Sequence, residues 1–367
     1  MIARMLFVPL ATLLVAAEPA IPQPTPAPAP AAPSPPLDPA TRKAVIDSAS
    51  RLLIDGYVYE DRARSYAAKL SAFTAAGRYD SLLDRAGFAR ALTRDLQEMS
   101  GDRHLRVMPD SAQAGGMPRF MRMPPGSGPG APGPPGAPVM RRMTPPGGAP
   151  GGPAPPGGPM TPMPPGRSVP NDGFARIEIL DGNIGYLDLR GFHGTDSGRA
   201  RVDSMMKAFS GVKAMVIDLG RNGGGDGMMV GYLSTYFFDQ PTHLVSQQLR
   251  GEPEPLERWT VESVPGPRFE GPVYVLISPR TFSAAESFAF GLDINGRVTL
   301  VGEKTGGGGH FGGVEPLAGG FSLWLSRGRT YDPRTGKGWE ADGLTPEVAV
   351  PYDQALDRAL EFARAAR

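Results

Sequence analysis

The sequence predicts an α/β protein, because apolar strand-like runs alternate with loops and helical patterns in its C-terminal half. The runs Ala214–Leu219, Val273–Ser278 and Val298–Gly302 are apolar almost throughout, which is typical of strands buried on both faces. Helical patterns follow the first two runs, at residues 229–237 and 283–292. Repetition of strand, loop and helix predicts an α/β core.

Shorter signals complete this segment, which we place at residues 172–367. An Asp-Gly-Asn turn between residues 175–180 and 184–189 indicates a hairpin. The remaining predicted elements are a helix around residues 202–209, a strand pair around 321–325 and a terminal helix at 353–365.

An N-terminal helical domain is predicted at residues 38–110. Asp38 and Pro39 favour a helix start, since Asp accepts hydrogen bonds from free amides and Pro suits the first helical position. Apolar residues at helical spacing mark a second helix that stops near Gly77 and a third that ends at Gly101. A short strand-like stretch, Leu105–Val107, follows.

Glycine and proline, 49 and 42 of 367 residues, are concentrated outside these segments. Residues 1–17 combine Arg4 with an apolar run that ends in small residues, which predicts a cleaved secretory signal peptide; an uncleaved anchor is the alternative. Residues 18–37 are a Pro/Ala-rich linker. Residues 111–171 form a Gly/Pro/Met-rich insertion that we predict to be disordered, or alternatively to act as a lid or docking segment. The protein is therefore expected to be periplasmic or secreted.

Charge and cysteine content exclude several classes of function. Discounting Arg4, Glu18 and the five arginines of residues 111–170 from the net charge of +1 leaves the folded part at about −4. No basic stripe remains, so nucleic acid is not an expected partner. The absence of cysteine excludes disulfides, thiolate metal sites and a cysteine nucleophile. We expect no cofactor, no metal and no stable membrane span.

Ser283 is the candidate nucleophile, since it stands between a predicted buried strand and a helix start. Ser283 and Glu286 also match a helix capping box, and the spacing alone does not separate the two roles. The glycine-rich loops at residues 223–225 and 306–309 do not match phosphate-binding patterns. They can present free amides to a ligand, as an oxyanion hole requires.

Four ordered motifs resemble the S41 peptidases, the tail-specific or C-terminal processing proteases, and especially the branch of the tricorn core and interphotoreceptor retinoid-binding protein. The motifs are Asp218-Leu219-Gly220-Arg221-Asn222-Gly223-Gly224-Gly225, Thr281-Phe282-Ser283-Ala284-Ala285-Glu286, Gly302-Glu303-Lys304-Thr305-Gly306-Gly307-Gly308 and Trp339-Glu340-Ala341-Asp342-Gly343-Leu344-Thr345-Pro346-Glu347. The helical segment also matches that branch, through Asp102-Arg103-His104-Leu105. The resemblance implies a crotonase/ClpP-like ββα core with a small three-helix domain and no PDZ domain.

The resemblance also implies a catalytic set. The Ser–Lys dyad of the processing branch does not map onto this chain, whereas the Ser, His and Glu of the tricorn-like branch map onto Ser283, His104 and Glu340. Ala284, Gly223 and Gly224 then form the oxyanion hole, and Gly306, Gly307 and His310 are expected to bind substrate. His310 is also the rival base.

Two departures from the family pattern concern loops: Gly220 stands where Arg is frequent, and Ala341 where Gly is usual. The expected function is an exported serine endopeptidase that acts on unstructured peptides or protein tails. The alternative is a non-catalytic binder of retinoid-like or fatty ligands on the same fold; a scaffold whose insertion recruits a partner has no positive support in the sequence. Neither the physiological substrate nor the oligomeric state follows from the sequence.

Overall fold

A computed structural model describes residues 36–110 and 170–366, which belong to one compact unit. The predicted signal peptide, and nearly all of the predicted linker and insertion, lie outside the described residues. Within the described part, no helix is long and apolar enough to cross a membrane.

Three helices form the N-terminal segment, as predicted: α1 (Pro39–Gly56), α2 (Glu60–Ala75) and α3 (Arg85–Ser100). Asp38 caps α1 by accepting the Thr41 amide at 2.9 Å, and Gly101 ends α3 with a φ of +73° that favours glycine. The three helices share a buried core with strand residues from far along the chain, including Phe321 and Leu323.

A six-stranded sheet forms the second segment. Its order is β11–β8–β7–β4–β3–β2, and only β2 runs antiparallel to its neighbour. The strands are β2 (Phe174–Leu180), β3 (Ile184–Leu189), β4 (Ala214–Asp218), β7 (Val273–Ile277), β8 (Thr299–Gly302) and β11 (Val348–Ala349). A short 3₁₀ turn, η3 (Pro170–Gly173), precedes β2.

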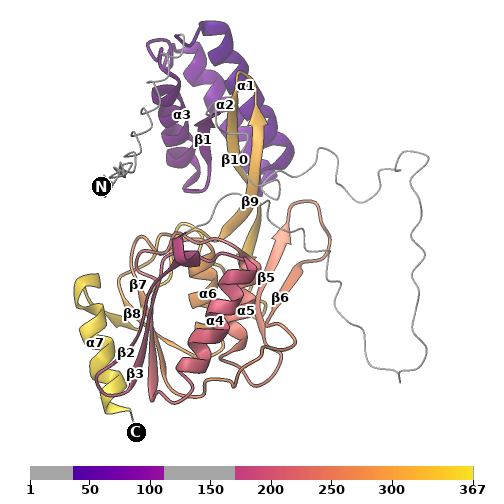
Figure 1. Cartoon of the computed structure of the whole chain (residues 1–367). Coiled ribbons are helices and arrows are strands. Elements are labelled where there is room, and N and C mark those ends of the chain that lie inside the picture. The colour runs from indigo at the N-terminus through magenta and orange to yellow at the C-terminus, as the bar shows by residue number, and fades with distance from the viewer. Residues whose placement is uncertain (1–35, 111–169, 367) are drawn as a thin grey trace, which may run out of the picture. The chain divides into compact units, whose positions relative to one another are not determined.

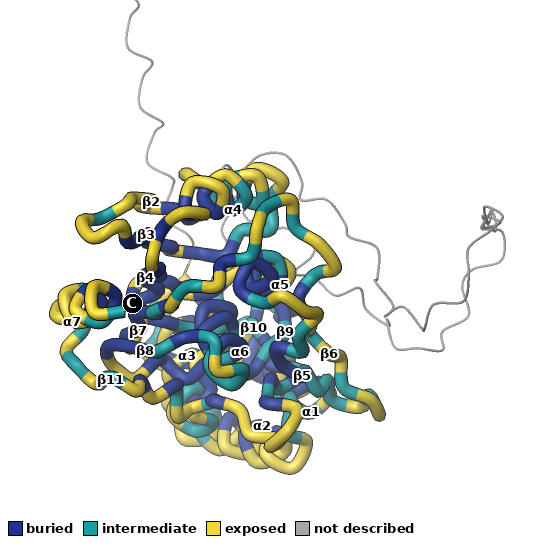
Figure 2. Tube along the Cα trace, turned by 90° about the horizontal axis from the view of Figure 1, so that it is seen from below, coloured by how far each residue is buried: buried dark blue, intermediate teal, exposed yellow. Residues whose placement is uncertain are grey.

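Helices cover both faces of this sheet, which is why its central strands are apolar on both sides (Figures 1 and 2). In β4, Met215 and Ile217 pack with α4 (Asp196–Ala208), α5 (Gly227–Thr235) and α6 (Ala284–Asp293). Ala214 and Val216 pack on the other face, against α7 (Tyr352–Ala365). The predicted α/β class is confirmed.

A second sheet links the two segments. Its order is β1–β10–β5–β6, with β9 also paired to β10, and the strands are β1 (Arg106–Pro109), β5 (His243–Leu249), β6 (Leu256–Trp259), β9 (His310–Leu317) and β10 (Phe321–Tyr331). The long strand β10 pairs with β1 through residues 321–324 and with β5 through residues 328–331. The hairpin of β9 and β10 therefore runs from the α/β core to the N-terminal helices (Figure 1). Strands β5 and β6 were not predicted from the sequence.

Candidate active site

Ser283 lies at the junction between β7 and α6, as predicted. Its backbone has φ +56° and ψ −119°, a region that residues with a side chain rarely adopt. Holding such a residue there costs about 1–3 kcal/mol, and strain of this kind concentrates at functional sites. The conformation supports a role for Ser283 beyond starting a helix.

Glu286 holds the Ser283 turn in place. Its side chain is fully buried, and it accepts hydrogen bonds from the amide of Ser283 at 2.8 Å and the hydroxyl of Thr305 at 2.5 Å. The amides of Gly307 and Gly308 donate to it at 2.7 and 2.8 Å. Burial raises the pKa of Glu286, and the four hydrogen bonds oppose that rise. The predicted capping box is present, and Glu286 also ties the nucleophile turn to the loop after β8.

The glycine loop at residues 220–225 is locked against the same turn. The Phe282 amide donates to the carbonyl of Asn222 at 3.0 Å. The Asn222 side chain is fully buried, donates to the Leu189 carbonyl and accepts the Gly224 amide, both at 2.9 Å. These bonds fix the distance between the loop and the start of α6.

Two of the three predicted oxyanion donors remain free to serve as such. The Gly224 amide is taken by Asn222, whereas the Gly223 and Ala284 amides donate to no residue in the described ranges. A methyl group on Gly224 would lie 2.9 Å from Cβ of Ser283 and 3.0 Å from the Ala284 nitrogen. Glycine at this position therefore allows the loop to approach the nucleophile closely.

His104 lies on the turn between α3 and β1, and its ring packs beside the residue before Ser283. The ring centroids of His104 and Phe282 are 4.5 Å apart. The His104 side chain is only 8% exposed, and neither ring nitrogen has a hydrogen-bond partner among the described residues, Ser283 included. Burial lowers the pKa of His104 to about 4, although the Asp102 charge opposes this. His104 is therefore neutral near pH 7 and able to accept a proton.

Asp102 connects His104 with a second histidine. Its Oδ1 accepts the His104 amide at 2.9 Å and lies 3.8 Å from His104 Nδ1. Its Oδ2 lies 2.9 Å from Nδ1 of His310. Burial favours the neutral acid, but the hydrogen bond and charge of His310 outweigh it and hold the pKa of Asp102 below its usual range. Asp102 is therefore a buried carboxylate shared by two histidines.

Glu340, on the loop after β10, reaches His310 rather than His104. Its Oε2 accepts the His310 amide at 2.7 Å, and its Oε1 lies 3.5 Å from Nδ1 of His310. Burial and the Asp102 charge raise the pKa of Glu340 to about 7. No hydrogen bond joins Glu340 to His104 among the described residues, so the two are connected through Asp102 and His310.

His310 itself is buried among aromatic rings. Its side chain is 2% exposed, and the ring centroids of Tyr57 and Tyr59 lie 6.3 and 5.4 Å from its own. The substrate-binding role expected of His310 stays a prediction.

The backbone groups of Gly306 and Gly307 are occupied within the protein. The Gly306 amide donates to the Thr281 carbonyl, and Arg103 donates to the Gly306 carbonyl at 2.9 Å. The Gly307 carbonyl accepts the Ala341 amide, while its own amide binds Glu286. Their expected contact with substrate also stays a prediction.

The structure explains the departure at Gly220 and shows a conformational penalty at Ala341. A side chain on Gly220 would overlap the ring of Tyr352, since its Cβ would lie 1.8 Å from a ring carbon. The Tyr352 hydroxyl instead donates to Asp218 at 2.8 Å. Ala341 has φ +64°, a conformation that glycine adopts without penalty.

Asp102 is the residue of the candidate site that sequence reasoning missed. Its adjacency to His104 was visible, but its contact with His310 joins positions 208 residues apart. Only the pairing of β1 and β9 with the two sides of β10 brings them together.

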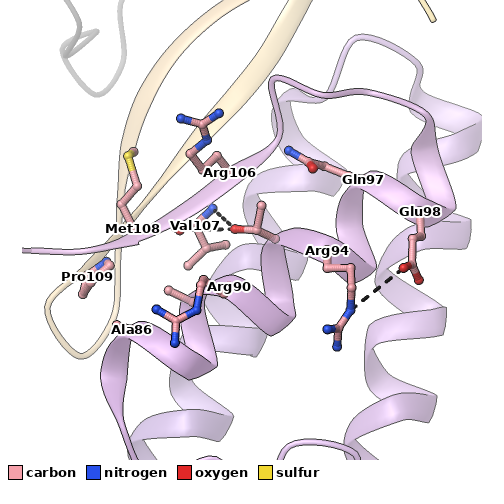
Figure 3. Close-up of a pocket in the computed structure, with 11 residues that line it drawn as sticks. Ala86, Arg90, Arg94, Gln97, Glu98, Arg106, Val107, Met108 and Pro109 are labelled. Atoms are coloured by element: carbon pink, nitrogen blue, oxygen red, sulfur yellow. Dashed lines mark hydrogen bonds and ion pairs between the residues drawn. The ribbon is translucent and has the colours of Figure 1, made fainter.

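A separate groove of about 480 Å³ lies between α3 and β1 (Figure 3). Its lining includes the apolar side chains of Ala89, Val107 and Met108 and exposed arginines at positions 90, 94 and 106. Thr93 bonds both backbone groups of Val107, at 2.9 and 3.2 Å. The outer edge of β1 is therefore closed to an added strand at this point.

Comparison with known proteins agrees with this architecture. The profile of Peptidase family S41 matches residues 183–350, and the profile described as the N-terminal domain of Peptidase_S41 in eukaryotic IRBP matches residues 37–126. A candidate peptidase from Parabacteroides merdae shares the fold with a TM-score of 0.56 and 16% identity, over 88% of this chain and 96% of that one. A lipoprotein from Streptococcus agalactiae does so with a TM-score of 0.52 and 13% identity, over 89% and 96%. Since profiles of both segments match in the expected order, the chain belongs to peptidase family S41.

Proposed function

We propose that the protein is an exported serine endopeptidase that cleaves unstructured peptides or protein C-terminal tails, with Ser283 as nucleophile and His104 as general base. Membership in a peptidase family supports hydrolysis of peptide bonds. The observation that carries the proposal is the pairing of a strained serine with a buried, neutral histidine whose ring packs on the preceding residue, Phe282.

In the proposed reaction, the hydroxyl oxygen of Ser283 attacks the substrate carbonyl carbon and its proton passes to Nε2 of His104. Nδ1 of His104 lies on the side of Asp102, 3.8 Å from Oδ1. The Asp102 carboxylate would stabilise the imidazolium that forms. His104 then gives the proton to the leaving amine, and a water hydrolyses the acyl-enzyme by the same route in reverse.

The amides of Ala284 and Gly223 are the donors that we assign to the oxyanion. Neither amide donates a hydrogen bond to a described residue. Because Gly224 has no side chain, the loop can lie close to the start of α6. Fixed donors of this kind typically contribute about 2.7–4 kcal/mol to the transition state. His310 and Glu340 would act behind Asp102, by holding its carboxylate toward His104.

Cleavage of a fluorogenic, unstructured peptide by the purified chain tests this function. Ser283→Ala should abolish cleavage. Ser287→Ala, which alters a half-buried serine one turn further along α6, is the matched control and should retain it. Equal cleavage by the parent and Ser283→Ala would rule the assignment out.

Export is tested separately, since it depends on residues 1–17, outside the described range. Expression of the full chain in a Gram-negative host should yield a periplasmic product whose N-terminus lies near residue 18. A product that keeps Arg4 would contradict a cleaved signal peptide.

A second candidate, binding of an anionic amphiphile such as a fatty acid, is favoured by the α3–β1 groove. Its volume of about 480 Å³ suits a small ligand, and Arg90 and Arg106 take part in no ion pair among the described residues. Titration with a fluorescent fatty acid should show binding that Arg106→Ala weakens and Arg51→Ala, an exposed change on α1, does not. Absence of binding by the parent would remove this candidate.

A further inference from the structure

The described residues bring together one imidazole and two carboxylates beside His104. We call Asp102, His310 and Glu340 the acidic histidine cluster. Asp102 Oδ2 and Glu340 Oε1 lie 2.9 and 3.5 Å from His310 Nδ1. One possible ligand atom from each residue lies within 4.8 Å of those from the other two. The three residues come from the turn before β1, the start of β9 and the loop after β10.

These distances suit a small metal ion. Zinc binds imidazole nitrogen and carboxylate oxygen at about 2.0–2.2 Å, so two of its ligands in a tetrahedral site are about 3.3 Å apart. The distances from His310 Nδ1 to Asp102 Oδ2 and to Glu340 Oε1, 2.9 and 3.5 Å, fall on either side of that value. The backbone also prepares the site, since the His310 amide holds the other oxygen of Glu340 at 2.7 Å.

The cluster holds two carboxylates and only one imidazole among the described residues. Asp102 is 1% exposed, the Glu340 side chain is 19% exposed, and His310 is the one imidazole between them. Oε1 of Glu340 is buried and accepts no hydrogen bond from any described residue. Burying two carboxylates near each other is unfavourable unless a cation or a proton compensates them.

A second buried and unpartnered group adjoins the cluster. The His104 side chain is 8% exposed, both of its ring nitrogens lack hydrogen-bond partners in the described residues, and Nδ1 lies 3.8 Å from Asp102 Oδ1. A site that combines imidazole nitrogens with carboxylates favours transition metals. Mg²⁺ and Ca²⁺ instead prefer six or more oxygen ligands.

We propose that Asp102, His310 and Glu340 bind one divalent transition-metal ion, with Zn²⁺ the best match, and that the bound ion inhibits the hydrolase. The ion takes the place of the proton between His310 and Asp102, and the imidazole proton moves to the other ring nitrogen. Asp102 is then committed to the ion and no longer supports His104. Binding is independent of the proposed function, whereas inhibition rests on it.

Metal binding can be measured without catalysis by using the full chain with Ser283→Ala. After treatment with a chelator, titration with ZnCl₂ against a fluorescent zinc indicator should show one ion per chain. Adding His310→Gln or Glu340→Gln should weaken binding by at least about tenfold. His243→Gln, which changes a β5 histidine bonded to Ser246, is the matched control and should leave affinity unchanged.

Failure to bind zinc, or equal affinity in the parent and both cluster variants, would overturn the site. A thermal melt shows whether each variant is folded; if His310→Gln unfolds, Glu340→Gln decides alone. Co²⁺ gives a second readout, because tetrahedral coordination produces visible absorption that both variants should lose. Zinc that binds as expected without slowing fluorophosphonate labelling of the parent would overturn the inhibition and leave the site standing.

Discussion

Nδ1 of His310 lies 2.9 Å from Oδ2 of Asp102, a contact between residues 208 positions apart. Through it, the N-terminal helical segment and the β9–β10 hairpin share one buried carboxylate. The same Asp102 lies 3.8 Å from Nδ1 of His104. The family resemblance points to a glutamate as the acidic partner, yet the residue beside His104 is Asp102.

Backbone strain at Ser283 should be measurable as stability. Ser283→Gly relieves the positive φ, whereas Ser283→Ala retains it. We expect the free energy of unfolding, measured in urea, to be about 1 kcal/mol higher for the glycine variant than for the alanine variant. Neither variant should cleave peptide. A glycine variant no more stable than the alanine variant would show that the turn is not strained.

Replacing Glu286 should disrupt the nucleophile turn. A Gln side chain offers one acceptor oxygen, whereas the Glu286 carboxylate offers two. Some of the four hydrogen bonds to Glu286 are therefore lost, and their donors are left unsatisfied inside a buried site. Glu286→Gln should lower the free energy of unfolding by about 2–4 kcal/mol and abolish labelling of Ser283. Glu270→Gln, at an exposed position, is the control and should change neither. An unchanged stability in Glu286→Gln would contradict the role assigned to its carboxylate.

Ala341 occupies a left-handed conformation that glycine favours. Ala341→Gly should raise the free energy of unfolding by roughly 0.5–1 kcal/mol, because an alanine at φ +64° carries a steric penalty. The same exchange at Ala68, exposed in α2, should lower stability by a similar amount. Chemical denaturation of the two variants checks the opposite signs; a loss of stability at both positions would refute the argument.

Glu340 should make stability depend on pH. Its pKa of about 7 in the folded protein exceeds the ordinary value of 4.5, so the folded state binds the proton more tightly. This contribution is present in full below pH 4.5 and is lost as pH rises through 7. Between pH 5 and 8, the free energy of unfolding of the parent should fall by on the order of 2 kcal/mol relative to that of Glu340→Gln. Parallel stability curves for the two proteins would contradict this.

His104 should keep the enzyme active in mild acid. Its pKa of about 4 lies below the ordinary value of 6.5, so it remains neutral across this interval. The stability that it contributes is full above pH 6.5 and falls as pH drops toward 4. An ordinary histidine would lose about tenfold in neutral fraction between pH 7.5 and 5.5. The labelling rate of Ser283 should change by less than about twofold over that range. A labelling rate that falls in acid with a midpoint near pH 6.5 would contradict the low pKa of His104.

The α/β core was predictable because its signal is local. Runs such as Ala214–Leu219 are apolar at nearly every position that a two-sided sheet buries, with Asp218 the exception, and the helices between them have caps and apolar faces. Strands β5 and β6 carry no such signal. β5 places Ser246, Gln247 and Gln248 at its paired positions, and β6 is mostly exposed, so neither shows an apolar run.

The parts of the site differ in the same way. Ser283 and the glycine loops were found from motifs, since the turn after a buried strand is set by neighbouring residues. The role of Asp102 depends on strand pairing across most of the chain, and no short window of sequence contains His310 as well. The engagement of Gly224 with Asn222 is a local loop geometry that composition does not encode.

The central claim, that His104 activates Ser283, is tested most directly by fluorophosphonate labelling followed by peptide mapping. The account predicts that the parent is labelled on Ser283, that His104→Ala is labelled at least about a hundredfold more slowly, and that His310→Ala retains more of the rate than His104→Ala. A parent that is not labelled at Ser283 would contradict the account. Normal labelling of His104→Ala together with loss in His310→Ala would show that His310 is the base instead.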